Sequence, residues 1–338
     1  MAPEGAGRLI MRSTHEVVAV AAIGTGVGLG HAMRAHSILM SFAAEGTDTT
    51  LVLQWRGDDA QRNTMEKRFG AGMNCVVIPD LEEALKYKPG ALLLTDIPEG
   101  HALPFARIRK ERGSPVVCLN AYGLPDEHPD AAFLRGMYWE HTTHPEHQWA
   151  VGGATFEVLS KKIQSLRPAH PWSSANVNRI LLTCGAADPG EISEAAIPLL
   201  GYLAKELIVV AGPLFKLERI RHLQSLENAC IKVVNAPADI ASHMLRSDLI
   251  ISLGGQTTWE AMFLGRPVAM IRWGPTARAA DYFVSNGAAL DFGTINELPN
   301  RSAWSLADAA ALRKQAARNF EMVDGKGAAR TVAWLRAH

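Results

Sequence analysis

A glycine-rich turn followed by a histidine is the first feature of this sequence that could do chemistry. Glycines alternate over Gly24–Gly30, directly after an apolar run, and His31 follows at the expected start of a helix. The positive end of a helix dipole disfavours an imidazolium ion there, and a neutral imidazole can act as a general base near pH 7. We therefore predict that His31 is a catalytic base; the alternative is that it caps or packs at the turn.

The same turn does not match two common phosphate-binding patterns. The dinucleotide fingerprint G-x-G-x-x-G fails in both registers, because its third glycine would be Leu29 or His31. A Walker A loop needs Gly-Lys-Ser/Thr, and the chain has no such triplet. Ordinary Rossmann redox chemistry and P-loop phosphoryl transfer are therefore disfavoured.

A second glycine turn lies in the C-terminal half. An apolar run that ends at Leu253 is followed by paired glycines and by a helix start; these residues are Gly254, Gly255, Gln256 and Thr257. Backbone N–H groups at such a turn, together with the helix N-terminus, favour an anion. Glu260 lies about one turn into the helix, where its carboxylate could accept hydrogen bonds from ribose hydroxyls. The alternative is a tight turn with a solvated glutamate.

Two further strand ends carry small or acidic residues. Gly185 to Asp188 follows an apolar run and precedes Pro189, so these residues belong to the same presumed site, although Asp188 is alternatively a helix cap. Asp96 ends another apolar run and is a candidate for contacting the substrate or for orienting His31. Against this, an aspartate at a strand end is commonly a turn residue.

These residues need a scaffold, and the chain alternates apolar runs of strand length with helical segments. The alternation predicts α/β domains with parallel sheets. A polar stretch with two prolines at 167–178 predicts a linker between domains 1–166 and 179–338. Ligands bind outside the carboxyl ends of such strands, so a cleft between the halves is expected. The predicted strands are Glu16–Ile23, Thr50–Gln54, Cys75–Ile78, Ala91–Thr95, Val116–Asn120, Arg179–Thr183, Leu207–Ala211, Ile231–Val234, Leu249–Leu253 and Val268–Ile271. The predicted terminal helices, Ala307–Asn319 and Ala328–Arg336, could pack back on the first domain.

Composition excludes several classes of protein. The 338 residues include 34 basic and 34 acidic side chains, which leaves no overall basic field for nucleic acid. A hydrophobic content of 48% suits two packed cores and excludes low-complexity disorder. No apolar run reaches about 18 residues, so no transmembrane helix is predicted. Four dispersed cysteines without a C-x-x-C pair predict buried thiols in a reduced, cytoplasmic protein.

One histidine cluster invites a metal site. His141, His144 and His147 recur at intervals of three, but Pro145 breaks the helix that would align them. We predict no metal and no cofactor, and a solvated loop beside the cleft instead.

Four segments together resemble one superfamily. Gly28–Arg34 resembles the G-x-G-H-x-x-R of the UDP-sugar hydrolases of pseudaminic acid biosynthesis and their spore-coat polysaccharide relatives. Gly185–Pro189, Gly254–Glu260 and Asp324–Arg330 resemble that family's G-G-x-D-P, G-G-x-T-x-W-E and D-G-x-G-A-x-R, in the same order. Those hydrolases are similar to glycosyltransferases of the GT-B fold. The resemblance therefore implies α/β architecture with two Rossmann-like domains facing across a cleft.

The resemblance also implies a ligand and roles for the candidate residues. A nucleotide sugar, UDP-linked in the family, would place its phosphates at Gly254, Gly255 and Thr257 and its ribose at Glu260. His31 would deprotonate a water that attacks C1 without a metal, which is the hydrolase hypothesis. In the alternative transferase hypothesis it deprotonates an acceptor hydroxyl. A third hypothesis is a non-catalytic nucleotide-sugar-binding protein. The implied sugar-side contacts are Gly28, Gly30, Arg34, Asp96, Gly185 and Asp188.

The sequence departs from the family pattern on the sugar side. Val20 and Ala22 stand where the hydrolases carry an arginine and an aspartate, and Ala186 replaces a glycine. The family's Asn-Gln pair is missing from residues 276–280. The nucleotide half is therefore better preserved than the groups that would contact the sugar. The identities of the sugar and acceptor and the oligomeric state do not follow from the sequence.

Overall fold

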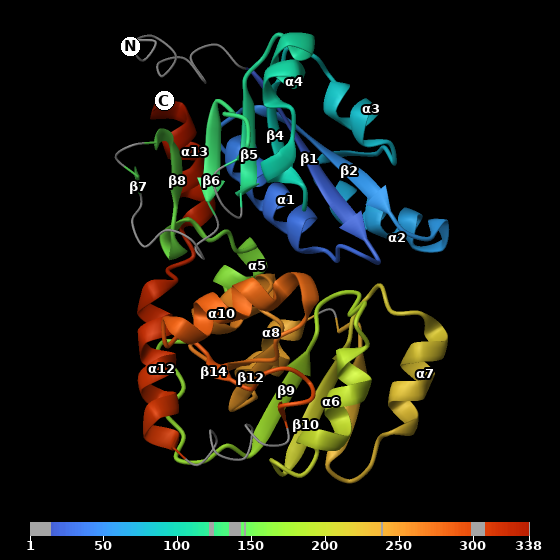
Figure 1. Cartoon of the computed structure of the whole chain (residues 1–338), viewed down its shortest axis with the longest axis vertical. Helices are drawn as coiled ribbons and strands as arrows, with labels where there is room; N and C mark the ends of the chain where they lie inside the picture. Colours follow the sequence, from blue (N-terminus) through green and yellow to red (C-terminus); the bar gives the residue numbers. More distant parts are fainter. Residues whose placement is uncertain are drawn as a thin grey trace. The chain divides into compact units, whose positions relative to one another are not determined.

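The computed structural model describes residues 15–121, 125–134, 143–144, 147–237, 239–298 and 308–337. The chain divides into two compact units, each with its own sheet (Figure 1). The first unit runs to Ser160 and takes up the chain again from Gly325, and the second unit is Lys161–Asp324.

The first unit is built on an eight-stranded sheet with the order β3-β2-β1-β4-β5-β6-β8-β7. The described strands pair in parallel, except that β7 is antiparallel to β8. From Val17 to Gly24, β1 is buried throughout, as its uninterrupted apolar run predicts. The elements are β1 (Glu16–Gly24), α1 (Gly30–Ala43), β2 (Asp48–Arg56), α2 (Asp59–Gly70), β3 (Asn74–Val77), α3 (Leu81–Lys86), β4 (Leu92–Asp96), η1 (Gly100–Ala102), α4 (Phe105–Arg112), β5 (Val116–Ala121), β6 (Ala131–Leu134), β7 (Thr143–His144), β8 (His147–Gly152), η2 (Ala154–Phe156) and α13 (Gly327–Ala337).

The second unit has a six-stranded parallel sheet with the order β11-β10-β9-β12-β13-β14. Residues 167–178 form neither helix nor strand, and Trp172 of this segment packs into the unit's hydrophobic core. The elements are α5 (Lys161–Gln164), β9 (Arg179–Thr183), α6 (Ile192–Leu200), β10 (Glu206–Ala211), α7 (Leu217–Ser225), β11 (Ile231–Asn235), α8 (Ile240–Leu245), β12 (Leu249–Ser252), α9 (Gln256–Phe263), β13 (Val268–Met270), η3 (Gly274–Thr276), α10 (Ala277–Ser285), β14 (Leu290–Asp291) and α12 (Ala309–Met322).

The two sheets share one topology. In each, the first strand in the sequence is central, the next two lie on one side, and the fourth begins the other side. This is the doubly wound Rossmann pattern, in which the strand order reverses beside the first strand. The reversal falls between β1 and β4 in the first unit and between β9 and β12 in the second. Ligands bind at the carboxyl ends of the strands at such a switch point.

The last helix belongs to the first unit because of close backbone packing at its start. A Cβ atom on Gly327 would lie 2.1 Å from the carbonyl oxygen of Glu157, so only glycine fits. Arg330 then donates to the carbonyl of Thr155 at 2.8 Å. The Trp334 ring meets that of Phe133 edge-on, with 5.4 Å between the centroids. The D-G-x-G-A-x-R segment therefore has a packing role here.

Composition predicted that the cysteines are buried and that the chain has no transmembrane helix. Cys118 and Cys184 are buried as expected, but Cys75 is half-buried and Cys230 is exposed. The burial prediction is wrong for Cys230, because it precedes the edge strand β11, where the chain faces solvent. Within the part of the chain that the structure describes, no helix is long and apolar enough to cross a membrane.

Candidate active site

The turn between β1 and α1 delivers His31 to the carboxyl end of the first sheet. Gly24 and Gly28 exchange backbone hydrogen bonds of 3.3 and 2.7 Å, which closes the turn. Gly24 has φ +148°, and a Cβ atom there would lie 1.9 Å from the carbonyl oxygen of Arg56, so the position requires glycine. Helix α1 begins at Gly30, and His31 lies in its first turn, as predicted.

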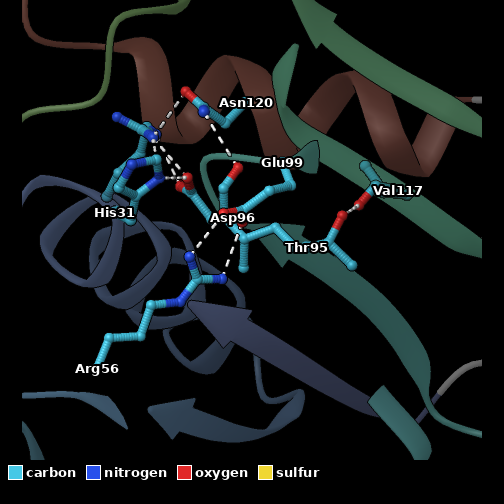
Figure 2. A network of polar contacts seen from close by, with 9 residues as sticks. His31, Arg56, Thr95, Asp96, Glu99, Val117 and Asn120 are labelled. Atoms are coloured by element: carbon cyan, nitrogen blue, oxygen red, sulfur yellow. Dashed lines mark hydrogen bonds and ion pairs between the residues drawn. The ribbon is translucent and has the colours of Figure 1, made fainter. Parts of the chain in front are cut away.

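His31 contacts Asp96, which arrives from 65 residues away in the sequence. The Nδ1 atom of His31 lies 2.7 Å from Oδ1 of Asp96 (Figure 2). Asp96 ends β4, which pairs with β1 at the switch point, with Ala21 opposite Asp96. The Asp96 side chain is fully buried and that of His31 is 13% exposed. The two residues at this switch point therefore form a histidine–carboxylate pair at the edge of the core.

Arg34 anchors the carboxylate. It lies one helical turn after His31, and residues three apart share a helix face. Its Nε donates to Oδ2 of Asp96 at 2.7 Å, and its Nη2 donates to Oδ1. The same Nη2 donates to Oδ1 of Asn120 at 3.1 Å. Burial alone would raise the pKa of Asp96, but the Arg34 cation and the hydrogen bond with His31 outweigh it and hold that pKa below its usual value.

The ionised carboxylate determines the proton position on the imidazole. An ionised Asp96 can only accept hydrogen bonds, so Nδ1 of His31 donates to it. This assignment follows from the hydrogen-bond network. The tautomer with the proton on Nδ1 has its lone pair on Nε2, the nitrogen that can take a proton from a nucleophile.

Asn120 is a member of the network that the sequence did not single out. It lies near the end of β5 and is completely buried, and its Nδ2 donates to the carbonyl of Ile97 at 3.3 Å. The available signal was a polar side chain ending an apolar strand beside β4. In the structure, Asn120 connects Arg34 to the backbone that follows Asp96 (Figure 2).

A second ion pair lies near the first. Arg56, the last residue of β2, makes a bidentate pair with Glu99, with distances of 2.7 and 2.8 Å (Figure 2). These hydrogen bonds from Arg56 lower the pKa of Glu99, and the charge of His31 contributes in the same direction. The pair is drawn beside the contact of His31 with Asp96, and Glu99 follows Asp96 closely in the sequence (Figure 2).

The second glycine turn follows β12 at the switch point of the second unit. Gly254 has φ +94°, and a Cβ atom there would lie 3.1 Å from Cβ of Ala279 and 3.2 Å from N of Ala280. Gly255 is exposed, and a Cβ atom on it would meet no heavy atom of the described residues within 4 Å. Helix α9 starts immediately afterwards, at Gln256. The turn therefore combines an accessible backbone with a helix N-terminus.

A buried hydrogen bond connects the first turn of α9 to the end of β12. The Thr258 hydroxyl is completely buried and lies 2.8 Å from that of Ser252, at the end of β12. Gln256, Thr257 and Glu260 are half-buried. This arrangement fits an anion bound by backbone N–H groups beside a polar helix face.

Asp188 has the contacts of a helix cap. Its carboxylate accepts hydrogen bonds from N–H of Ile192 and of Ser193, both at 3.0 Å, at the start of α6. Arg219 donates to the same carboxylate at 2.6 Å. The side chain is 1% exposed and the backbone has φ +41°. These contacts correspond to the capping alternative, whereas neighbouring Gly185, with φ +87°, leaves the start of the turn without a side chain.

Most of the histidine cluster lies outside the described residues. His141 and the Pro145–Glu146 segment lie outside the described residues, as do the side chains of His144 and His147. Among the residues that are described, no group of three or more histidine, cysteine, aspartate or glutamate side chains could hold a metal ion.

Comparison with curated proteins finds a similar sequence. No protein-family model matches the chain. It is similar to the spore coat polysaccharide biosynthesis protein SpsG of Bacillus subtilis (strain 168), with 23% identity over 329 residues. The match covers 91% of this chain and 94% of SpsG, so it spans both units.

Solved structures with a similar fold include MurG of Acinetobacter baumannii and an S. aureus MnaA–UDP co-structure. MurG matches with a TM-score of 0.64 and 14% identity, covering 96% of this chain and 99% of MurG. MnaA matches with a TM-score of 0.64 and 13% identity, covering 94% of this chain and 95% of MnaA. Other matching structures are of glycosyltransferases. The chain therefore has the GT-B fold that its motifs predicted, with two Rossmann-like domains.

Proposed function

We propose that this protein is an enzyme that hydrolyses a nucleotide sugar, with His31 as the general base that activates water for attack at C1. The 2.7 Å contact between His31 and the buried, ionised Asp96 carries the proposal. A histidine that only packed at the turn would not need a buried carboxylate that an arginine also binds.

The chemistry follows from the hydrogen-bond network. Nε2 of His31 takes a proton from the attacking water as the bond to C1 forms and the bond from C1 to the diphosphate oxygen breaks. Asp96 stabilises the imidazolium that results and keeps the ring in the productive tautomer. Arg34, which also donates to Asn120, holds Asp96 in place, so little reorganisation accompanies the proton transfer.

The turn at Gly254 and Gly255 is the proposed nucleotide site. Its accessible backbone and the N-terminus of α9 would bind the diphosphate and stabilise the charge of the leaving group. Glu260 would accept hydrogen bonds from the ribose. UDP is the proposed nucleotide, supported by the motif resemblance and by the UDP in the MnaA co-structure. An (amino)deoxy sugar is the proposed sugar class, on the motif resemblance alone.

Sugar transfer to an acceptor hydroxyl is the second candidate function. It is favoured by the glycosyltransferases among the structures with this fold and by the Val20 and Ala22 departures. The two functions use the same base and differ in the nucleophile. In transfer, His31 takes its proton from the acceptor hydroxyl instead of from water.

A donor panel separates these functions. UDP release from a range of UDP-sugars is measured with and without candidate acceptor alcohols. Release without an acceptor supports hydrolysis, whereas slow release that an acceptor stimulates strongly supports transfer. Absence of turnover throughout, with retained UDP binding, contradicts both enzymatic proposals and favours a non-catalytic binding protein.

Replacement of the base tests its role. We expect His31→Ala to lower kcat by about 10²–10⁴ and to leave the Kd for UDP nearly unchanged. His222→Ala is the matched control, because His222 is an exposed histidine on α7. A His31→Ala variant that turns over normally, or that fails to bind UDP, contradicts the assigned role.

A further inference from the structure

The ion pair between Arg56 and Glu99 connects the two strands that flank β1. Arg56 ends β2 and Glu99 follows β4, and β1 lies between these strands in the sheet. The Arg56 side chain is 27% exposed and that of Glu99 is 54% exposed. Pairs this exposed contribute little to stability, so stabilising the fold does not account for the geometry.

Arg56 is held on several sides. Its Nε donates to Oε1 of Gln54 at 2.5 Å, and Nε2 of Gln54 donates to the carbonyl of Pro79 at 2.7 Å. The backbone carbonyl of Arg56 accepts a hydrogen bond of 3.1 Å from Thr25, in the glycine turn that leads to His31. The Arg56 guanidinium is therefore held in position relative to the glycine turn. It holds the Glu99 carboxylate through their two hydrogen bonds.

Two ion pairs lie near His31, and each consists of one carboxylate and one guanidinium group (Figure 2). Asp96, from β4, contacts the imidazole ring. Arg34, from α1, neutralises the Asp96 carboxylate, with its Nε 2.7 Å from Oδ2. Glu99, from the segment after β4, is drawn beside the contact of His31 with Asp96 (Figure 2), and Arg56, from β2, neutralises the Glu99 carboxylate. The uncharged Asn120, from β5, completes the polar surroundings of Arg34. A proton on His31 is therefore favoured by two carboxylates and disfavoured by two guanidinium groups.

We propose that Arg56 and Glu99 are positioning residues that set the proton affinity of His31 through opposing charges. Glu99 favours the imidazolium that forms during catalysis, and Arg56 limits this effect so that the imidazole stays neutral before the reaction. The inference rests on the proposed role of His31 as the base, and it adds two residues outside the motifs to the catalytic machinery.

The two halves of the pair should shift the pH dependence in opposite directions. Glu99→Gln removes a negative charge, so the acid limb of the kcat/KM profile moves to lower pH. Arg56→Gln leaves Glu99 without its neutralising partner, so the limb moves to higher pH. Each shift should be about half a unit, and the double variant should return close to wild type. NMR titration of the His31 imidazole, assigned with His31→Ala, measures the same shifts without requiring activity.

The exposed pair between Arg107 and Glu82, at 3.0 Å, supplies the matched control. Arg107→Gln and Glu82→Gln should leave the acid limb unmoved. Shifts of Arg56→Gln and Glu99→Gln in one direction, or no shift in either experiment, overturn the inference. Full activity of His31→Ala overturns the proposed function instead, so the two failures are distinguishable.

Discussion

The two switch points of this molecule have the same topology but differ in the groups that lie there. At the end of β1 and β4, the first unit gathers charged side chains in and beside its core, with Asp96 fully buried and bound by Arg34 and His31. At the end of β9 and β12, the second unit has the buried Gly254, the exposed Gly255 and the start of α9.

The difference lies in what each ligand group requires. Proton transfer needs a side chain with a set tautomer, which demands burial and charged partners such as Asp96. Diphosphate binding needs several N–H groups at close range, which side chains would obstruct. In the second unit the acidic residue at the switch point, Asp188, binds its own helix and Arg219. The same strand order thus carries two different kinds of proposed site.

Replacing Asp96 should have the largest effect on stability and on kcat, because Asp96 binds both Arg34 and His31. Asp96→Asn leaves the buried Arg34 without a counter-ion, and breaking a buried pair costs about 3–5 kcal/mol. It also removes the group that orients His31, so kcat should fall by about 10²–10⁴. Chemical denaturation and steady-state UDP release measure these two losses. A fully active and equally stable variant would break the comparison.

The same carboxylate gives the first unit a pH-dependent stability. The pKa of Asp96 is lowered in the folded state, so its contribution is present above the unfolded pKa of about 3.9. That contribution is lost as the pH falls through the lower, folded-state pKa. The difference in unfolding free energy between wild type and Asp96→Asn should therefore shrink at acidic pH. Denaturation curves at several pH values test the direction.

Asp188 tests whether the second switch point also depends on a side chain. Asp188→Asn weakens the cap of α6 and the partner of Arg219, so we expect a stability loss of about 1–3 kcal/mol. Because its oxygens already bind Ile192, Ser193 and Arg219, KM and the Kd for UDP should change little. A large rise in KM with unchanged stability would instead support the substrate contact that the motif predicts.

The paired glycines should give the smallest changes in stability. Gly254→Ala forces alanine to φ +94° against Ala279, which costs about 1–2 kcal/mol. Gly255→Ala has an extended backbone and open space, so its stability should change by less than about 0.5 kcal/mol. Both should weaken UDP binding. Unchanged UDP affinity in Gly255→Ala would show that the phosphates bind elsewhere.

The sequence predicted strands best where both faces are buried. All ten predicted strands occur, because continuous apolar runs such as that of β1 have few alternative structures. The strands β6, β7, β8 and β14 were missed: Ala131–Leu134 is very short, β7 and β14 are shorter still, and His147–Gly152 begins with polar residues. β7 and the start of β8 lie where a solvated loop was predicted, so that prediction is wrong for these residues. Their pairing depends on the rest of the sheet, which no local pattern contains.

The sequence could predict those residues of the candidate site that belong to a local motif or end a strand. His31 follows from the glycine turn, and Asp96 from its place at a strand end. Asn120 and Arg56 could not be singled out, because both end ordinary strands and acquire their roles only through neighbours that register and strand order supply.

The assignment of α13 to the first unit has a consequence for biosynthesis. α13 packs against α1, the helix that carries His31, and Arg336 lies over the Phe42 ring at 5.7 Å. The ribosome therefore completes every residue of the second unit before this packing partner emerges. The unit that is translated first is the last to have its full chain. Helix α1, which carries the proposed base His31, therefore gains its neighbour α13 only after the second unit has been translated.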